Sequence, residues 1–420
     1  FWTLAAVLIL FSFLKPGHSR NAEDLNRART LLMTQEGSSL SWMTTWPGNT
    51  YWFSVTGNAF VAYRVISGIA LALGGPVGPT TERRASVDGF NRFCNDNGWT
   101  PCFYSVTVDV KEIATSSGWG SVQVALETIL PLESLAFKGK KFQDIRTTLN
   151  KAPKEGIRAE WVTYGTARKG IRHQIDAISE EWIAERRLPE MGFTLGGVDE
   201  LKDPQVRCLL AIDEDNIVHA LTSWLPAYRN GTIVGWTLDL MRRRNAGFPT
   251  GIEFLIATAA LTFKDEGYEF ISLSGAPLAW EQEKETCVPP PVLDRLLHRL
   301  GTGLEPVYGF RSLQKFKDKF GPRYEPLYLV YPDAAALPRI ANAISRAYLP
   351  EVSVAQRISL ATQLFYRPPK QKDRPGPKPR RHPDSAIAAD RSPGPDAEVV
   401  PRAGTDQGPL SEGHCRKGPD

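Results

Sequence analysis

One stretch near the middle of this 420-residue chain restricts its fold more than any other. It begins with a β-type run, Thr232–Met241, whose only charged residue is Asp239, and continues into an Arg-, Gly- and Pro-containing loop, Arg242–Pro249. A helix-length segment and a second apolar run, Phe270–Leu273, follow. Strand, basic loop, helix and strand in this order predict a βαβ-like unit, and a basic loop at a helix N-terminus suits an anionic ligand.

The helix of this unit has a marked start. Thr250 and Glu253 have the T-x-x-E spacing of a capping box, in which side chains at the two positions satisfy free backbone N–H groups. Apolar residues then recur at the helical period. They predict a buried stripe made of Ile252, Leu255, Ile256, Ala259, Ala260 and Phe263.

The first half of the chain repeats this order of elements. Residues 52–72 alternate like two strands around a turn at residues 56–58. A Gly/Pro loop, Leu73–Pro79, then precedes a helix, Ser86–Asn95, and a strand, Cys102–Val110. The shared order predicts two lobes of related architecture, although the sequences of the halves have little in common.

The remaining pattern indicates an α/β (α+β) fold with mixed β-sheets. An amphipathic helix that ends before Pro189 joins the two halves, and its apolar residues are Ile171, Ile175, Ile178 and Trp182. The other expected elements are the helices Asn21–Gln35, Pro289–Leu300 and Leu337–Tyr348 and the strands Leu126–Leu135 and Pro326–Tyr331.

Composition narrows the class of protein. The formal net charge is only +4, so binding of anions must come from local patches. The six histidines have no metal-ligand spacing, and no metal or cofactor is predicted. The five cysteines form no C-x-x-C pair, which argues against a disulfide framework or a zinc site and fits a reducing compartment. They are Cys94, Cys102, Cys208, Cys287 and Cys415.

The two ends differ from the rest of the chain. The first fourteen residues, FWTLAAVLILFSFL, are apolar, and basic residues follow. A signal peptide would need a basic start and a small-residue cleavage site, so we expect residues 1–20 to be the end of a transmembrane helix, with the following part cytoplasmic. Residues 367–420 hold 11 of the 32 prolines and few apolar residues, which predicts a disordered tail.

Two stretches are strongly basic. Phe137–Arg158 contains seven Lys or Arg residues against two acids, and Val307–Phe320 contains four against one. Such runs are either solvated helix faces or phosphate-binding patches for nucleic acid or anionic lipid. The basic residues are Lys138, Lys140, Lys141, Arg146, Lys151, Lys154 and Arg158 in the first stretch and Arg311, Lys315, Lys317 and Lys319 in the second.

Several common catalytic signatures are missing from the sequence. It has no G-x-x-x-x-G-K-[ST] loop, and Ser274 lacks the flanking glycines of a nucleophile elbow. The loop Arg244–Pro249 is close to the R-x-x-G-x-G/A pattern that binds the pyrophosphate of acyl-CoA. Pro249 stands at its last small position and removes an N–H donor, which weakens an interpretation as a CoA-binding protein.

Six blocks taken together resemble the cytosolic catalytic domain of the phosphatidylglycerol lysyltransferases, the multiple peptide resistance factor family. The blocks are FKGKKFQDIRTTLNKA, MGFTLGG, LDLMRRR, G-x-E-F-L, SLSGAPLA and YGFRSLQKFKDKFGPRYEPLYLVY, and the resemblance covers roughly Ala22–Tyr348. It implies two GNAT-like lobes joined by a helix, here 21–158 and 191–350 around a linking region at 159–190. Leu273–Leu278 and Glu253 depart from the family pattern, which often has LGMAPL and Asp there.

The resemblance also implies a reaction. An aminoacyl group, expected to be lysine, would pass from aminoacyl-tRNA to phosphatidylglycerol at the cell membrane. Asp239 would hold the substrate ammonium or orient the attacking hydroxyl, and Arg242 would bind a phosphate. Glu253 and Lys317 are the next catalytic candidates. Substrate contacts are expected from Tyr308, Arg311, Lys315, Lys319, Lys138, Lys140, Lys141 and Arg146.

Other interpretations remain open at this point. The same fold could carry an acyl-CoA-dependent N-acetyltransferase, or the chain could be a non-catalytic domain that binds lipid or RNA. Asp239 could be a partner of Arg242 in an edge strand. Glu253 could serve only the capping box. The lysines of the second basic stretch could simply be solvated. Tyr308 could pack inside the fold rather than stack on the adenine at the 3′ end of the tRNA.

Overall fold

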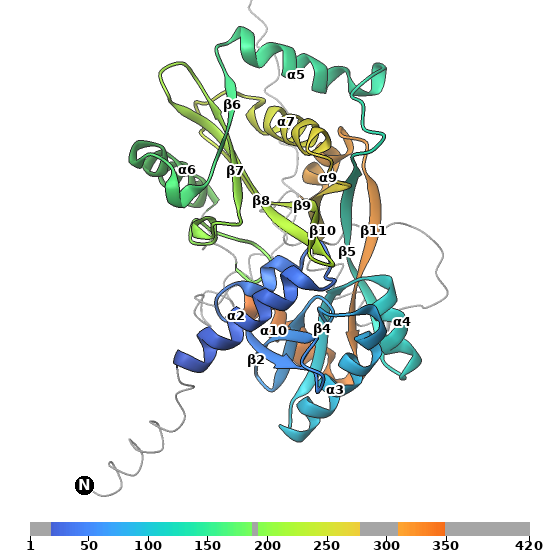
Figure 1. The fold of residues 1–420 in the computed structure, drawn as a ribbon. Coiled ribbons are helices and arrows are strands. Elements are labelled where there is room, and N and C mark those ends of the chain that lie inside the picture. The colour runs from blue at the N-terminus through green and yellow to red at the C-terminus, as the bar shows by residue number, and fades with distance from the viewer. Residues whose placement is uncertain (1–17, 187–191, 278–309, 349–420) are drawn as a thin grey trace, which may run out of the picture. The chain divides into compact units, whose positions relative to one another are not determined.

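The computed structural model describes residues 18–186, 192–277 and 310–348 (Figure 1). Most of the expected membrane helix at 1–20, the expected helix Pro289–Leu300 and the expected tail at 367–420 lie outside these ranges. Within them, no helix has both the length and the apolar character needed to cross a bilayer.

The described residues form an eleven-stranded sheet. Its order is β1-β2-β3-β4-β11-β5-β10-β9-β8-β7-β6. The strands of the first half are β1 (Thr50–Phe53), β2 (Phe60–Ile66), β3 (Ile69–Leu73), β4 (Thr100–Val106) and β5 (Gly120–Pro131). Those of the second half are β6 (Arg158–Val162), β7 (Arg207–Ile212), β8 (Val218–Arg229), β9 (Thr232–Arg243), β10 (Phe270–Pro277) and β11 (Arg323–Tyr331).

The predicted βαβ unit is confirmed. Strand β9 runs parallel to β10, and helix α7 (Gly251–Asp265) connects them. In the first half, β3 runs parallel to β4 and α3 (Arg83–Asp96) connects them, so the predicted repetition of element order is also present. All other strand pairs are antiparallel, which gives the mixed sheet that the GNAT-like α/β prediction required.

The last strand joins the two halves. Strand β11 lies between β4 and β5, and β5 pairs with β10 on its other side. The sheet therefore continues from one half into the other through backbone hydrogen bonds. The expected linking region contains strand β6 as well as helix α6 (Lys169–Arg186), and β6 pairs with β7 of the second half.

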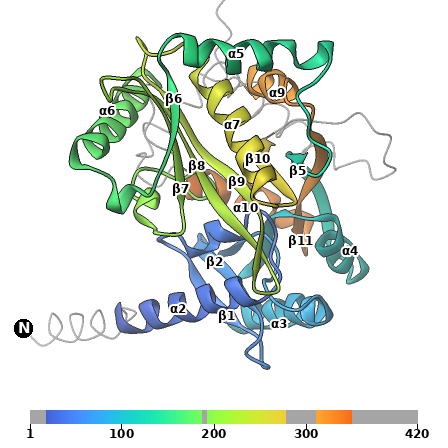
Figure 2. The ribbon, with the colours of Figure 1, turned by 45° about the horizontal axis from the view of Figure 1, so that its top comes forward.

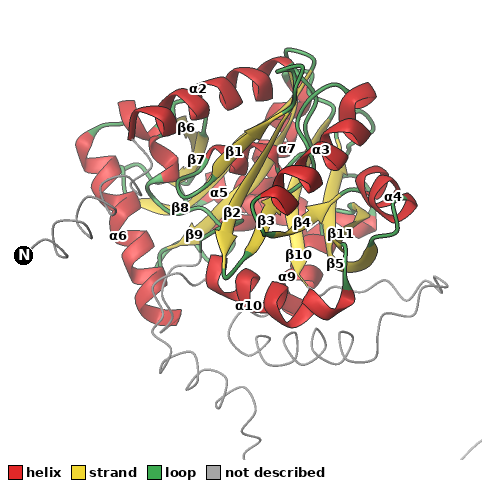
Figure 3. Cartoon of the chain, turned by 90° about the horizontal axis from the view of Figure 1, so that it is seen from below, coloured by secondary structure: helices red, strands yellow, loops and turns green. Residues whose placement is uncertain are grey.

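Helices cover both faces of the sheet (Figure 3). One apolar cluster extends along one face of both halves, beneath α2 (His18–Thr34), α6 and α10 (Leu337–Tyr348). The opposite face carries two separate clusters. One lies beneath α3 and α4 (Val108–Ser116), and the other beneath α5 (Gln143–Lys154) and α7. Strand residues alternate between the faces, as the period of a strand requires.

Three predicted elements were wrong in their bounds. Residues 52–72 form three strands, because Ser67 and Gly68 both have positive φ and close a two-residue hairpin between β2 and β3. The strand predicted at Cys102–Val110 ends at Val106, and α4 begins at Val108. The strand predicted at Leu126–Leu135 is β5, which starts six residues earlier, at Gly120, and ends at Pro131.

Phe263 of α7 offers a test of the core. Its side chain is fully buried, and its ring lies 5.1–5.7 Å from the rings of Trp161, Trp224, Trp236 and Tyr268. Phe263→Ala should lower the free energy of unfolding by roughly 3–5 kcal/mol, because it leaves a cavity among rigid rings. Urea unfolding measures this loss. Val55→Ala, at a fully exposed side chain, is the control, and a loss below about 1 kcal/mol for Phe263→Ala would contradict the packing.

Candidate active site

Two neighbouring strands bulge at the same level of the sheet. The parallel ladder between β9 and β10 ends after the pair Thr237 and Ser272. Just beyond it, β9 shifts register against β8, and β10 shifts register against β5 between Ser272 and Gly275. Bulges of this kind change the direction in which side chains point and are frequent beside functional sites. The two strands are therefore not paired where the candidate residues lie.

Side chains satisfy the backbone at both bulges. The Leu240 N–H donates to Ser223 Oγ at 2.9 Å, and the Ser274 N–H donates to Ser272 Oγ at 3.1 Å. Ser274 has a φ of 63°, a left-handed conformation that is uncommon for serine. Its hydroxyl donates to the carbonyl of Leu238, so Ser274 crosses from β10 to β9. The gap between the strands is thus held by specific polar contacts.

Asp239 lies within the β9 bulge. Its side chain is half-buried, and Oδ1 accepts a hydrogen bond of 2.9 Å from the Gly196 N–H. A Cβ at position 196 would lie only 2.2 Å from Asp239 Oδ2. The loop that contains Gly196 can therefore approach the carboxylate only because this residue is glycine. That glycine belongs to the MGFTLGG block of the sequence.

Arg242 lies three residues further along β9, not in the loop where the sequence placed it. Its side chain is 2% exposed, and the guanidinium carbon is 4.9 Å from the ring of Trp182 on α6. The strand continues to Arg243, so the basic loop begins at Arg244. Helix α6 thus covers the β9 side of the candidate site.

Lys317 approaches the same bulges from the other side. It lies on α9 (Phe310–Asp318), is 3% exposed, and donates from Nζ to the carbonyl of Ser274 at 3.1 Å. Burial lowers the pKa of Lys317 to about 7. Ser274 also contacts Leu238, the neighbour of Asp239, so Lys317 binds the residue that connects the two bulges. The neighbouring Lys315 is exposed, as expected of a solvated face.

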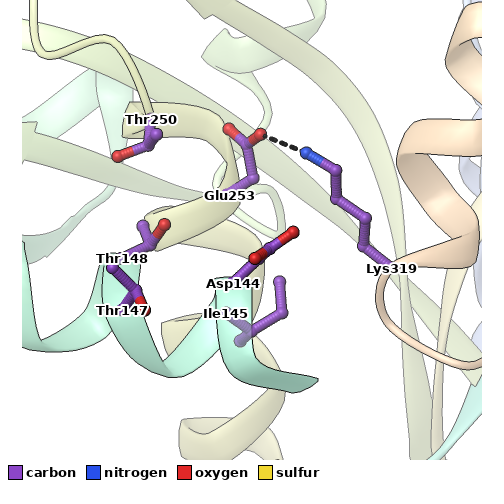
Figure 4. A pocket seen from close by; sticks show the side chains of 7 residues that line it. All are labelled: Asp144, Ile145, Thr147, Thr148, Thr250, Glu253 and Lys319. Carbon is purple, nitrogen blue, oxygen red and sulfur yellow. Dashed lines mark hydrogen bonds and ion pairs between the residues drawn. The ribbon is translucent and has the colours of Figure 1, made fainter. Parts of the chain in front are cut away.

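Glu253 does not form the predicted capping box. Thr250 precedes α7 with φ −101° and ψ 25°, outside the extended region that an N-cap usually adopts, and its side chain makes no cap hydrogen bond. Glu253 instead forms an ion pair with Lys319, with Oε1 and Nζ 3.0 Å apart (Figure 4). The pair borders a cavity of about 250 Å³. The cavity is lined by Asp144, Ile145, Thr147, Thr148, Thr250, Glu253 and Lys319.

The structure brings the two basic stretches together. Helices α5, α7 and α9 lie at the same end of the sheet in both views (Figures 1 and 2). The rings of Phe137 and Phe320 are 6.4 Å apart, and a Cβ on Gly321 would lie 2.9 Å from Lys141 Nζ. Lys141 of the first stretch therefore lies beside the end of the second. The exposed residues Lys138 and Lys140 come just before it in the chain.

The other predicted substrate contacts differ in their surroundings. The Arg146 guanidinium donates to the carbonyls of Phe137 and Gly139, at 3.2 and 2.6 Å, so it holds the lysine-containing loop in place. Tyr308 and the side chain of Arg311 lie outside the described residues.

Sequence reasoning missed a buried carboxylate beside the site. Glu127 of β5 is 2% exposed and accepts hydrogen bonds from the hydroxyls of Ser272, at 2.6 Å, and Ser39. The only local signal was a single acid inside the apolar run of β5. Trp182 and Gly196 were also missed as neighbours of the site, because their contacts join segments far apart in the chain.

Lys317→Met should raise the melting temperature at pH 6. The folded-state pKa near 7 lies below the ordinary value of 10.5, so the buried charge destabilises the fold fully below pH 7. This cost disappears as pH rises from about 7 to 10.5. The variant also loses the hydrogen bond to Ser274. After allowing for that loss, its free energy of unfolding at pH 6 should exceed that of the parent by on the order of 2 kcal/mol.

Melting curves between pH 6 and pH 9 measure this effect. The difference in melting temperature between Lys317→Met and the parent should shrink across that range. Lys315→Met, at an exposed neighbour, should show no such trend. An advantage that is independent of pH, or no advantage at pH 6, would contradict a buried amine with a lowered pKa.

Residues 28–331 match the family model described as phosphatidylglycerol lysyltransferase, C-terminal. An uncharacterized protein of Corynebacterium glutamicum is 42% identical over 359 residues, and the match covers 84% of this chain and 44% of that protein. A phosphatidylglycerol lysyltransferase of Staphylococcus xylosus is 26% identical over 315 residues, covering 74% of this chain and 36% of the relative. This chain thus spans less than half the length of both relatives.

Two solved structures have a similar fold. One is the C-terminal domain of a putative lysylphosphatidylglycerol synthetase from Agrobacterium fabrum, with a TM-score of 0.68 at 22% identity and coverage of 79% of this chain and 99% of that chain. The other is L-PGS from Bacillus licheniformis, with a TM-score of 0.67 at 21% identity and coverage of 76% and 95%. The family model covers well over half of the sequence, and the chain therefore belongs to the phosphatidylglycerol lysyltransferase C-terminal family, a family of transferases.

Proposed function

We propose that this chain transfers an aminoacyl group, expected to be lysine, from aminoacyl-tRNA to the head group of phosphatidylglycerol. The observation that carries the proposal is the gap between β9 and β10. Asp239 lies in the β9 bulge beside it, and the buried amine of Lys317 donates to Ser274 in the β10 bulge. Acyl transfer from an ester to a hydroxyl needs a group that exchanges a proton near neutral pH, and transfer of an amino acid also needs an anion for its ammonium.

The proposed chemistry assigns a role to each side chain. A hydroxyl oxygen of the glycerol head group attacks the ester carbonyl carbon, and the bond from that carbon to the tRNA ribose oxygen breaks. Neutral Lys317 accepts the hydroxyl proton and returns it to the departing ribose oxygen, which its pKa of about 7 permits in both directions. Asp239 holds the substrate ammonium. Arg242, buried at the end of β9, provides a fixed positive charge for a phosphate.

The exposed lysines next to this site suit the acceptor end of tRNA. Lys138, Lys140 and Lys141 lie close together in the chain, and Lys141 lies beside Gly321, two residues after Lys319. Arg146 fixes that loop through its carbonyls, so the lysines are presented from a defined backbone. This arrangement favours a phosphate-binding surface over three unrelated solvated residues.

The proposal also includes the cellular setting. The Staphylococcus xylosus relative is named for its action on phosphatidylglycerol and is much longer than this chain. We infer that the described domain acts at the cytoplasmic face of the cell membrane, where both the lipid and aminoacyl-tRNA are available. The proposal also keeps the division of the chain into two GNAT-like lobes, at residues 21–158 and 191–350.

Asp239→Asn should reduce aminoacyl transfer about 100-fold or more, because the substrate ammonium loses its counter-charge in a half-buried site. The melting temperature should change little, since asparagine can still accept the Gly196 hydrogen bond. Transfer of labelled lysine from lysyl-tRNA into phosphatidylglycerol vesicles measures the rate. Asp96→Asn, at an exposed residue of α3, is the control. Full activity of Asp239→Asn would refute the proposed site.

The combined variant Lys138→Gln, Lys140→Gln, Lys141→Gln should bind tRNA with a weaker salt dependence. Each phosphate contact contributes roughly 0.7–0.9 to the slope of log affinity against log salt, so the slope should fall by about 2. Titrations of tRNA at several salt concentrations measure it. The matched control, Arg92→Gln, Lys169→Gln, Lys202→Gln, removes the same charge from exposed sites elsewhere. Equal slopes in both variants would show that only net charge matters.

A further inference from the structure

Glu127 occupies a position that the proposed chemistry does not use. Strand β5 places it between β10 and β11, where its register partners are Gly275 and Glu325. The carboxylate accepts the hydroxyl of Ser272, the residue at which β10 begins to bulge, and the hydroxyl of Ser39 in the loop after α2. The carbonyl of Ser39 in turn accepts the hydroxyl of Thr237 on β9 at 2.7 Å. One buried carboxylate therefore ties together both strands that border the gap.

A buried carboxylate is costly, and the fold alone does not require one. Well-packed apolar residues in place of buried charges often leave a protein equally stable or more stable. Hydrogen bonds connect this carboxylate to the amine of Lys317. Ser272 donates to Glu127 and accepts from the Ser274 N–H, and the carbonyl of Ser274 accepts from Lys317. Burial raises the pKa of Glu127 and lowers that of Lys317.

Several other charged groups lie on the elements around the pair, and Arg242 on β9 is as buried as Glu127. Glu325 on β11 is 44% exposed and forms an ion pair with Arg323 at 2.9 Å. Strand β10 carries no ionisable side chain. The remaining charged residues on α9 and the turn after it are Arg311, Lys315, Asp318 and Lys319, those on β9 are Asp239, Arg242 and Arg243, and those on α7 are Glu253, Lys264 and Asp265.

We propose that Glu127 is a positioning residue of the transfer site, whose buried negative charge, held at the β10 bulge that binds Lys317, sets the pH range in which Lys317 exchanges its proton. This inference rests on the proposed function. Glu127 contacts neither substrate in this scheme. It acts through Lys317, and through Ser272 it holds the bulge whose carbonyl, at Ser274, receives the Lys317 hydrogen bond.

The test compares the pH profiles of the full chain and of Glu127→Gln. Glutamine has nearly the same shape and can still accept a hydroxyl, but it carries no charge. Lysyl transfer into phosphatidylglycerol vesicles is measured from pH 5.5 to pH 9. In the parent, the transfer rate should rise near pH 7, where Lys317 loses its proton, and this rise is the limb of the profile. In Glu127→Gln the limb should move to lower pH by about one unit or more, because Lys317 loses the opposite charge that favours its protonated form.

Glu325→Gln is the matched control. It removes one carboxylate from the adjacent strand at an exposed site, so its limb should stay where the parent limb lies. A Glu127→Gln enzyme whose rate falls equally at every pH, with the limb unmoved, would show that Glu127 is only structural and would overturn the proposal. A shift of equal size in both variants would overturn it too, since any nearby charge would then suffice.

A second measurement separates this proposal from the proposed function. If the parent chain transfers no lysine, the proposed function fails, and the pH dependence of the melting temperature still tests the coupling. The gain in stability that accompanies deprotonation of Lys317 should begin at lower pH in Glu127→Gln than in the parent. Coincident stability profiles would refute the coupling. If Glu127→Gln does not fold, Glu127→Asp, which retains the charge, should keep the parent limb, and a limb displaced by one unit or more would count against a role for charge.

Discussion

The structure depends on a parallel strand pair that stops pairing. Strands β9 and β10 share three residue pairs and then separate, which leaves backbone groups that the ladder cannot satisfy. Buried backbone groups must find other partners. Here Ser223 accepts from Leu240, Ser274 donates to Leu238, and Lys317 donates to Ser274. The same contacts that keep the strands apart therefore position the chemistry-bearing side chains.

The continuity of the sheet makes this gap rigid. Strand β5 hydrogen-bonds to β10 on one side and to β11 on the other, so the bulge of β10 is held against a long antiparallel ladder. A site built on strands is placed more accurately than one built on loops. Such a scaffold can carry three buried charged residues, Glu127, Arg242 and Lys317, that would destabilise a looser fold. The stability given up there is consistent with selection for function.

Much of the fold could be predicted because its signals are local. The βαβ unit followed from the periods of its apolar residues, and the crossover helix α7 begins within one residue of the expected place. Errors arose where local signals conflicted with tertiary contacts. The T-x-x-E spacing at Thr250 predicted a cap, but Glu253 bonds to Lys319, which is 66 residues away. At Ser67-Gly68 a two-residue hairpin replaced a continuous strand.

By itself the sequence determined the order of the elements, the two basic stretches and the candidate residues Asp239, Arg242 and Lys317, whose roles stay predictions. Only the tertiary structure decided which lysine of the second stretch is buried, since Lys315, Lys317 and Lys319 are equally spaced in the chain. It also decided that β11 lies between β4 and β5, and that Glu127 holds the β10 bulge at which Lys317 binds. The physical reason is that burial and pKa depend on contacts between residues far apart in sequence, which local periodicity does not encode.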